Sequence, residues 1–413
     1  MSSEAIRPST LDGIKRLAKS LKSERGIQHV RALGDAAQVA GFQNFRHASN
    51  VLRTAAPNMA DTNNRLFIAK PFSYFDLKGE CNFPSPDLIR SNARQGIVTA
   101  LVLDANICLN LSNYARGQKD PIKESMFRQF LLAVEMVKVD VVPYFGCLEL
   151  ASTRGNDQLN TSKLSSITSN VARALAQSEE SLALGRQIST RIADELEMTD
   201  KSLSEAFPML RYAYCCFLKI FEIRSRGFLK DRAVKHFIEF FDWCETMECH
   251  VGLISQAAFA LFGGAKEADK LLSLREGKTP LDAAWGAAWD IWHCWMVQNY
   301  FPTLPVDGLP QHSIFVTDDA AAAFVAGQCL PRAMFLNAGK PFLSASVLSY
   351  NFPFYVDKRE RLNEQLRARD SRRFDRMLSN VVNASKFNHA RVQTEVEQLE
   401  QTIMATWTGT VPD

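Results

Sequence analysis

Acidic residues stand where the strands of this sequence are expected to end. Asp104 closes one apolar run, Asp318 and Asp319 close another, and Glu149 lies a few residues beyond a third. A fifth acid, Asp290, interrupts the otherwise apolar stretch AAWDIWHCWMV. Carboxylates in such places can hold a divalent cation or cap the helix that follows. Which of the two they do depends on whether the fold brings them together.

Three short apolar runs precede these acids: IVTALVL at 97–103, VDVV at 139–142 and SIFVT at 313–317. Each is rich in β-branched residues and short enough for a buried parallel strand. Because helical segments separate the runs, the sequence predicts an α/β fold with a parallel sheet. The carboxyl ends of parallel strands meet at one edge of a sheet, so acids far apart in the sequence are expected to converge there.

The position of Asp290 indicates a metal ion. No lysine or arginine lies within one helical turn of it, and burying an unpaired carboxylate is costly. Carboxylates gathered without basic partners repel one another unless a divalent cation neutralises them, and all-oxygen ligation favours Mg²⁺ or Mn²⁺ over zinc. Such an ion can activate water for phosphodiester hydrolysis, so Asp104 is expected to hold a metal. His293 and the tryptophans near Asp290 are expected to belong to the core.

The same residues resemble the motifs of PIN-domain nucleases. LVLDANICLNL is similar to the first motif, in which a strand ends in Asp, any residue, Asn, here Asp104 and Asn106. PYFGCLELA is similar to the second motif, with Glu149 as its acid, and VTDD is similar to the Thr-x-Asp strand end, with Thr317 and Asp319. The resemblance implies a compact α/β fold with a parallel sheet, an acidic metal site and cleavage of single-stranded RNA.

Two aspartates compete for the third acidic position of this pattern. Asp282 lies three residues after Thr279 in TPLD, where helix capping explains it. Asp290 has no such explanation, so we prefer it and keep Asp282 as the alternative. The residues expected to bind the metal and act in catalysis are then Asp104, Glu149, Asp290 and Asp319.

Several of these residues also have an ordinary structural interpretation. Asp104 with Asn106 would also serve as a helix cap, and Glu149 alone would serve as a solvated helix residue, although the metal interpretation is preferred for both. Asp318 fits a cap as well as a ligand. In the metal interpretation, Asn106 and Thr317 steady the ligands, and Thr317 does so by hydrogen bonding rather than by contact with the ion.

Changes in pattern along the chain divide it into segments. Helical periodicity dominates both ends and the middle of the chain, and strand patterns are concentrated in two separate parts. We also expect a helix over 120–138, a strand RLFIA at 65–69 and a fourth strand RAMFLN at 332–337. The expected segments are a basic helical N-terminal module (1–60), a linker (61–97), a PIN-like domain in two parts (98–155 and 278–337), a helical insertion (156–277) and a helical C-terminal region (338–413).

Composition limits the class of protein. The 413 residues exceed what one simple core usually supports, and 46% hydrophobic with 23% charged residues is typical of a folded chain. The nine cysteines include no CxxC pair, which indicates reduced thiols. No apolar run reaches membrane-spanning length and no signal peptide begins the chain, so we expect a cytoplasmic protein without a membrane partner.

The formal net charge of +3 does not by itself indicate nucleic-acid binding, but basic residues gather near both ends of the chain. They suit phosphate contacts, although charge pairs within helices would also explain the C-terminal group. We expect a metal-dependent endoribonuclease, of the kind found as a bacterial toxin or defence effector. Alternatives are a non-catalytic PIN-like scaffold that binds RNA or a protein partner, and a related metal-dependent DNA nuclease; homo-oligomerisation and a regulatory partner stay open.

Overall fold

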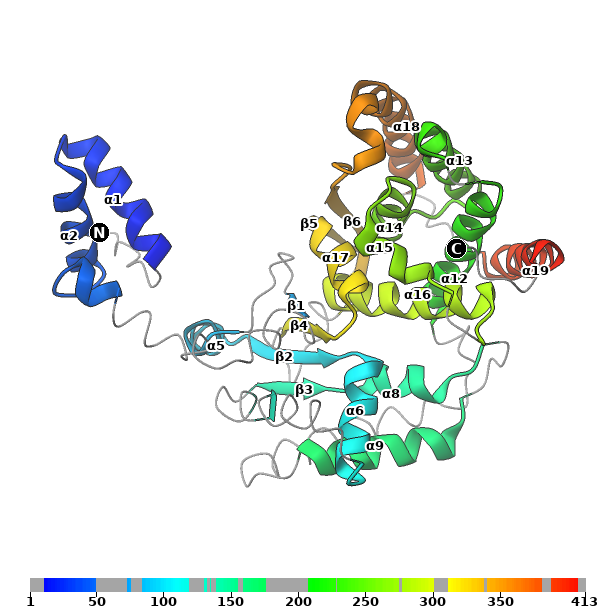
Figure 1. The fold of residues 1–413 in the computed structure, drawn as a ribbon, viewed down its shortest axis with the longest axis horizontal. Coiled ribbons are helices and arrows are strands. Elements are labelled where there is room, and N and C mark those ends of the chain that lie inside the picture. Colours follow the sequence, from blue (N-terminus) through cyan, green and yellow to red (C-terminus); the bar gives the residue numbers. More distant parts are fainter. Residues whose placement is uncertain are drawn as a thin grey trace. The chain divides into compact units, whose positions relative to one another are not determined.

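The protein forms two compact units, Met1–Ala69 and Lys70–Asp413, and each is described by itself. Figure 1 shows the elements of both in a computed structural model. The structure describes residues 11–49, 73–75, 84–118, 130–131, 134, 139–154, 159–175, 207–227, 229–274, 277–300, 311–337, 340–380 and 388–407.

Apolar residues, most of them on two helices, form the core of the first unit. Helices α1 (Leu11–Arg25) and α2 (His29–Val39) pack against each other through alanines combined with larger residues such as Leu17 and Leu33. The buried residues of this core are Ile14, Ala18, Leu21, Ala32, Ala36, Ala37 and Ala48. On α1, Lys15, Lys19 and Lys22 are exposed at a spacing that places them along one face of the helix.

A four-stranded sheet with the order β1-β4-β2-β3 organises the second unit. The central strand β2 (Val98–Leu103) is parallel to β3 (Asp140–Val142) and to β4 (Gln311–Thr317), whereas β1 (Ser73–Phe75) pairs antiparallel with β4. The predicted parallel arrangement of the three strands is therefore confirmed. Their registers bring the carboxyl ends of all three to one edge of the sheet.

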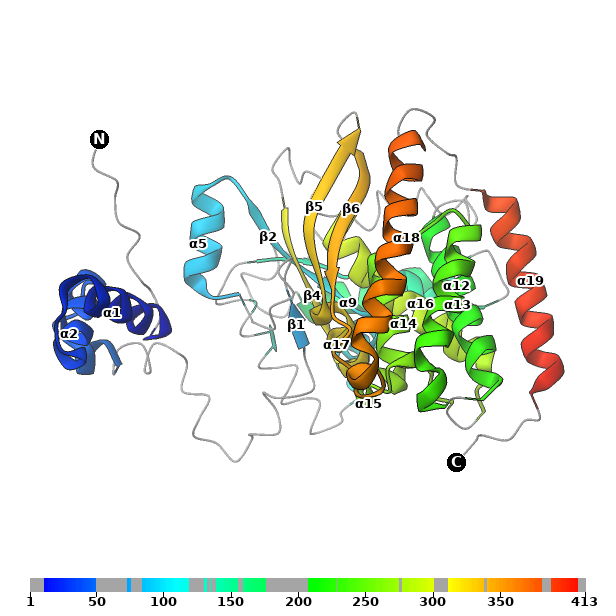
Figure 2. The same cartoon turned by 90° about the horizontal axis from the view of Figure 1, so that it is seen from above.

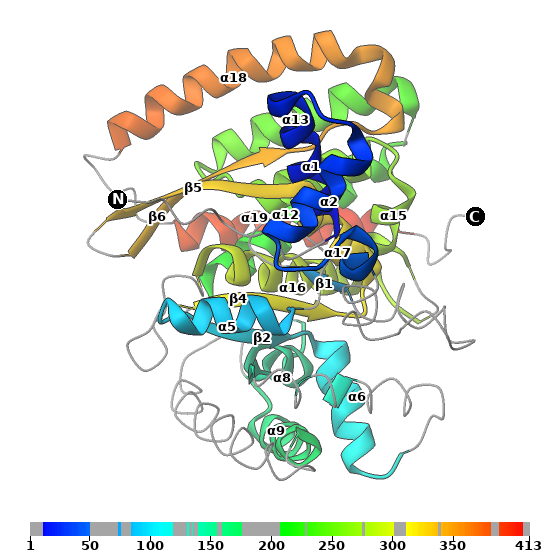
Figure 3. The same ribbon diagram turned by 90° about the vertical axis from the view of Figure 1, so that its left-hand side faces the viewer.

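Helices cover both faces of this sheet (Figures 1 and 3). On one face lie α6 (Ala105–Ala115), α8 (Tyr144–Ala151) and α9 (Thr161–Leu175). On the other lie α16 (Pro280–Trp295) and α17 (Ala320–Gln328). Apolar residues occupy almost the whole circumference of α16, which is the pattern of a helix buried on all sides.

The described elements between α9 and α16 are helices. The longest are α12 (Pro208–Ser225), α13 (Ala233–Thr246) and α14 (Gly252–Phe262). Near the C-terminus, α18 (Arg359–Asn380) is followed by α19 (His389–Thr406), and α19 packs on α12. The shorter helical elements are α5 (Pro86–Arg94), η2 (Lys230–Arg232), α15 (Lys266–Asp269), η3 (Lys270–Leu272), the π-helical turn η4 (Met296–Tyr300) and η6 (Pro353–Lys358).

The fourth strand does not join the parallel sheet. Strands β5 (Cys329–Asn337) and β6 (Lys340–Leu348) form a separate antiparallel hairpin, visible in Figure 2. β5 begins directly after α17 ends, so no residues remain for the connection that a further parallel strand would need to reach the sheet. The following strand, β6, is close in sequence and pairs with β5 as an antiparallel hairpin. The expectation that 338–413 is entirely helical is therefore wrong over β6.

The expected linker contains regular structure. Strand β1 and helix α5 both fall within 61–97, and the amide of Asn92 on α5 donates to Thr99 Oγ1 at 2.8 Å and lies 2.9 Å from Nδ1 of His312. These contacts tie α5 to β2 and β4. The expected strand RLFIA lies outside the described residues, as does most of the helix expected over 120–138. None of the described helices has the length and apolar character needed to cross a membrane.

Candidate metal centre

Asp104 stands between the end of β2 and the beginning of α6. Its backbone N–H donates to the Val316 carbonyl at 3.0 Å, which continues the pairing with β4. Its side chain caps α6, since Oδ1 accepts from the Ala105 N–H at 2.6 Å, and Oδ2 accepts from the Thr317 hydroxyl at 2.6 Å. The residue is 1% exposed. Strand pairing, capping and a hydrogen bond thus fix one buried carboxylate at the sheet edge.

Thr317, the last residue of β4, connects two of the predicted acids. Its buried hydroxyl donates to Asp104 and accepts from the backbone N–H of Asp319 at 2.9 Å. Asp319 in turn caps α17, because Oδ1 accepts from the N–H groups of Ala321 at 2.7 Å and Ala322 at 2.9 Å. The predicted role of Thr317 as an orienting residue agrees with this geometry.

Glu149 reaches the site from α8, which lies unusually close to Asp104. A Cβ atom added to Gly146 would stand 2.7 Å from Cys108 Sγ and 2.8 Å from the carbonyl carbon and oxygen of Asp104. Only glycine permits that approach. Because Glu149 lies one turn further along α8, the close contact carries its side chain, which is 21% exposed overall, toward Asp104.

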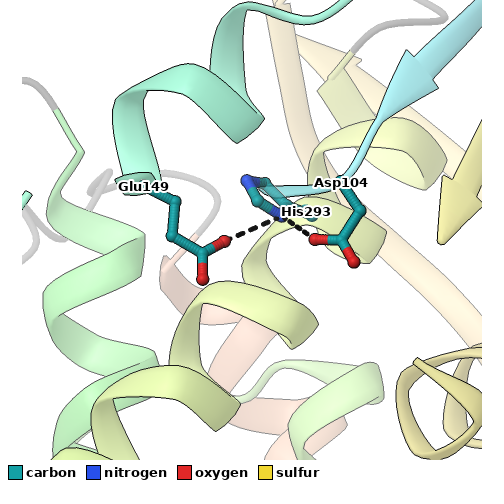
Figure 4. Close-up of side chains that lie close together, drawn as sticks. All are labelled: Asp104, Glu149 and His293. Atoms are coloured by element: carbon teal, nitrogen blue, oxygen red, sulfur yellow. Dashed lines mark ion pairs between the residues drawn. The ribbon is translucent and has the colours of Figure 1, made fainter. Parts of the chain in front are cut away.

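Helix α16 contributes Asp290 and His293, which share one face of the helix because they are three residues apart. The His293 ring is fully buried, and its Nδ1 lies 3.6 Å from Asp104 Oδ1 and 3.6 Å from Glu149 Oε2 (Figure 4). One ligand atom from each of these three residues lies within 4.8 Å of the other two. The two acids and the imidazole therefore surround a space that a single ion could bridge.

The electrostatics of the site follow from its acidity. Burial raises the pKa of Glu149 well above its ordinary value, and the charge of Asp104 raises it further, while exposed Lys278 acts in the opposite direction. Burial also raises the pKa of Asp290, with the charges of Asp319 and Asp104 adding to the effect. The ionised forms of these carboxylates thus destabilise one another, and a divalent cation would remove that penalty.

Asp282, the alternative third acid, belongs to a different set of contacts. Its carboxylate completes a capping box with Thr279 and forms a salt bridge with Arg154 at 2.7 Å. Burial alone would raise the pKa of Asp282, but the hydrogen bonds from Arg154 and Thr279 outweigh it and lower that pKa to about 2. The carboxylate already has its counter-charge, whereas Asp290 faces other acids.

The two remaining supporting residues differ in their surroundings. Asp318 is partly buried, and its negative charge contributes to the raised pKa of Asp290. Asn106 is exposed on the first turn of α6 and, among the described residues, makes no hydrogen bond to Asp104. The structure therefore gives Asn106 no contact through which it would steady this ligand.

His293 is the residue of the site that sequence reasoning did not select. It does lie in the core, where its ring makes tilted contacts with the rings of Trp289, Trp292 and Phe315, as expected. Its edge nevertheless faces two acids. The signal in the sequence was the spacing Asp-x-x-His on an apolar helix, which places the imidazole beside Asp290 on the same face.

The donor set fits a divalent cation. Asp104 at the β2–α6 junction and Glu149 on α8 supply carboxylate oxygens, and α16 supplies an imidazole nitrogen of His293; this group of three does not include Asp290 or Asp319. Glu149 Oε2 and both nitrogens of His293 are buried without a hydrogen-bond partner among the described residues. Comparisons of the chain with protein-family models, with curated proteins and with solved structures found no match. The chemistry of the site therefore has to be inferred from its own residues.

Proposed function

We propose that the protein is a metal-dependent nuclease that hydrolyses phosphodiester bonds of single-stranded RNA. The observation that carries this proposal is the gathering of acids from separate elements at the carboxyl edge of the sheet, with no matching set of basic residues in the part of the chain that the structure describes. The expected metal ligands are Asp104, Glu149, Asp290 and Asp319, with Mg²⁺ or Mn²⁺ as the ion. The ligand edge of a parallel α/β sheet is also where such proteins commonly bind their substrates.

The residues of the site have separable roles in this reaction. A divalent cation would supply an activated water and offset the charge that develops on the phosphate oxygens. Thr317 holds Asp104 and the start of α17 in register, which limits the movement of both carboxylates. The aromatic side chains around His293 keep bulk water from one side of the centre, which strengthens the interactions of charges there.

Two further features favour a nucleic-acid substrate. Lys278 is exposed beside Glu149 and offers a positive charge where a phosphate would approach the carboxylates. The exposed lysines of α1 form a second basic surface on the N-terminal unit. Together with the resemblance of the acidic motifs to those of PIN-domain nucleases, they support RNA as the substrate. DNA is the alternative substrate to be compared.

The test is cleavage of end-labelled single-stranded RNA and DNA by purified protein in Mn²⁺, Mg²⁺ or EDTA. Asp290→Asn is expected to lose activity by about 100-fold or more, since it removes a ligand. Asp282→Asn is the matched control because it makes the same change on the same helix outside the acid cluster, and it should keep its activity.

The outcomes separate the alternatives. Cleavage of DNA but not of RNA would replace the proposed substrate. A folded protein that binds Mn²⁺ and cuts neither polymer would favour a scaffold that binds RNA or a protein partner. Equal cleavage by wild type and Asp290→Asn would remove this site from the reaction.

A further inference from the structure

The imidazole of His293 has no role in a purely carboxylate metal site. Its side chain has no exposed surface, and neither ring nitrogen has a hydrogen-bond partner among the described residues. A buried polar group without a partner costs free energy, so its retention in the core needs a reason. One ring nitrogen points at the acids, as Figure 4 shows.

We propose that His293 Nδ1 is a ligand of the bound ion, so that the centre is a mixed nitrogen–oxygen site that binds Mn²⁺ in preference to Mg²⁺. This inference rests on the metal centre of the proposed function and specifies which ion occupies it. Imidazole is a good ligand for first-row transition ions, whereas Mg²⁺ is bound by oxygen atoms and retains much of its water.

The distances suit a shared ion. Nδ1 lies 3.6 Å from Asp104 Oδ1 and 3.6 Å from Glu149 Oε2. A tetrahedral ion with bonds of about 2.1 Å would separate neighbouring ligand atoms by about 3.4 Å, and an octahedral ion by about 3.0 Å. Each carboxylate oxygen therefore needs to approach Nδ1 by only about 0.2–0.6 Å. The two carboxylate oxygens lie within 4.8 Å of each other, and rotation of the Glu149 side chain can bring them closer around one ion.

An ion pair between a protonated His293 and the acids fits less well. A single Nδ1–H points in one direction, and at 3.6 Å it forms no normal hydrogen bond with either carboxylate. One positive charge also leaves the remaining acids around Asp290 unbalanced. A divalent cation, in contrast, satisfies the nitrogen lone pair and both carboxylates together.

The helix supports the same assignment. Asp290 and His293 lie on one face of α16, so one rigid element carries the imidazole donor and an acid on the same side. The rings of Trp289, Trp292 and Phe315 pack around the imidazole and limit its rotation. A preorganised ligand of this kind raises the affinity for ions that accept nitrogen.

The experiment measures Mn²⁺ and Mg²⁺ binding to the metal-free full chain by isothermal titration calorimetry. Wild type should bind Mn²⁺ at least about 10-fold more tightly than Mg²⁺. His293→Phe keeps an aromatic ring in the core and removes both nitrogens, so it should lose about 10-fold or more in Mn²⁺ affinity with little change in Mg²⁺ affinity. The matched control is His236→Phe, a buried histidine of α13 whose charged neighbours are not the site acids, and it should bind like wild type.

Pulsed electron paramagnetic resonance provides a second readout that needs no variant. Bound Mn²⁺ in wild type should show coupling to a nitrogen nucleus, and that coupling should change when the histidines are labelled with ¹⁵N. Absence of histidine coupling would overturn the inference, as would an unchanged preference for Mn²⁺ in folded His293→Phe. Both experiments measure binding, so their outcome is independent of cleavage. Histidine coupling of bound Mn²⁺ in a protein that cuts no nucleic acid would refute the proposed function and leave this inference standing. Cleavage by a protein whose bound Mn²⁺ shows no histidine coupling would refute this inference and leave the proposed function standing.

Discussion

Replacing Gly146 with alanine tests whether α8 must lie against the Asp104 backbone to form the site. The added Cβ would stand 2.8 Å from the Asp104 carbonyl, whereas ordinary contacts begin at 3.4 Å. The difference, 3.4 − 2.8, requires α8 and the backbone of Asp104 to separate by about 0.6 Å. Overpacking of this kind costs about 1–3 kcal/mol, and the better helix propensity of alanine returns up to about 1 kcal/mol.

Gly286→Ala is the matched control for this substitution. Gly286 also lies inside a helix, α16, but an added Cβ there meets no atom within 4 Å. The control should therefore gain about 0.5–1 kcal/mol from helix propensity alone. Urea unfolding of both variants should show Gly146→Ala less stable than wild type by about 1–2 kcal/mol and Gly286→Ala slightly more stable.

The same substitution should weaken the metal centre, because Glu149 moves with α8. A displacement of about 0.6 Å is comparable to the misplacements that cost catalytic sites roughly 100-fold, so we expect Mn²⁺ affinity to fall by about 10-fold or more. Calorimetric titration of both variants measures this. The reasoning is refuted if Gly146→Ala is as stable as Gly286→Ala and binds Mn²⁺ like wild type.

Substitutions at three positions, Thr317, Asp290 and Asp282, follow from the same geometry. Thr317→Val removes the hydrogen bond to Asp104 and should reduce Mn²⁺ affinity about 10–100-fold, whereas Thr317→Ser should retain it; equal titrations would contradict the positioning role. Asp290→Asn removes a partly buried acid that other acids repel, so it should raise the melting temperature of the protein in EDTA at pH 7.5 by roughly 2 °C or more. A lower melting temperature would count against that repulsion. Asp282→Ala should cost about 1 kcal/mol at neutral pH after allowance for its partial exposure. The pKa of Asp282 is lowered to about 2 in the folded protein, so its stabilising effect is present above the ordinary pKa near 3.8 and is lost as the pH falls toward 2. The urea midpoints of variant and wild type should therefore converge over that range. A difference between the midpoints that stays constant would exclude the salt bridge with Arg154 as its source.

The parts of the fold that sequence patterns predict are those whose packing is local or strongly apolar. The runs ending at Leu103, Val142 and Thr317 are buried strands because their β-branched residues leave no polar face. Their parallel arrangement then follows from the helices between them. The pairing of β5 with β6 was not predicted, because an apolar run does not indicate which neighbouring strand it will pair with.

The contrast between Asp282 and Asp290 shows what a sequence reveals about a site. The capping interpretation of Asp282 is confirmed, because Thr279 precedes it at the spacing of a capping box. Its salt bridge with Arg154 joins residues 128 positions apart, and no local pattern signals it. Asp290 stood out in the sequence as an acid in an apolar helix, and in the structure it is partly buried and feels the charges of other acids.

His293 shows why a donor set is harder to predict than a fold. A histidine among tryptophans on an apolar helix is typical of a core residue, and this one is buried among rings. Whether its nitrogen also faces an acid depends on how α16 crosses the sheet edge, which is set by packing far from His293 in sequence. Gly146 is similar, since only the structure reveals the backbone that its missing side chain accommodates.

The measurement that tests the metal centre most directly is an anomalous difference map from crystals of the protein soaked in Mn²⁺, recorded at the manganese absorption edge. The account predicts a peak about 2.0–2.5 Å from Asp104 Oδ1, Glu149 Oε2 and His293 Nδ1 together. A map with no peak at that position, with the imidazole hydrogen-bonded to a carboxylate in its place, would contradict it.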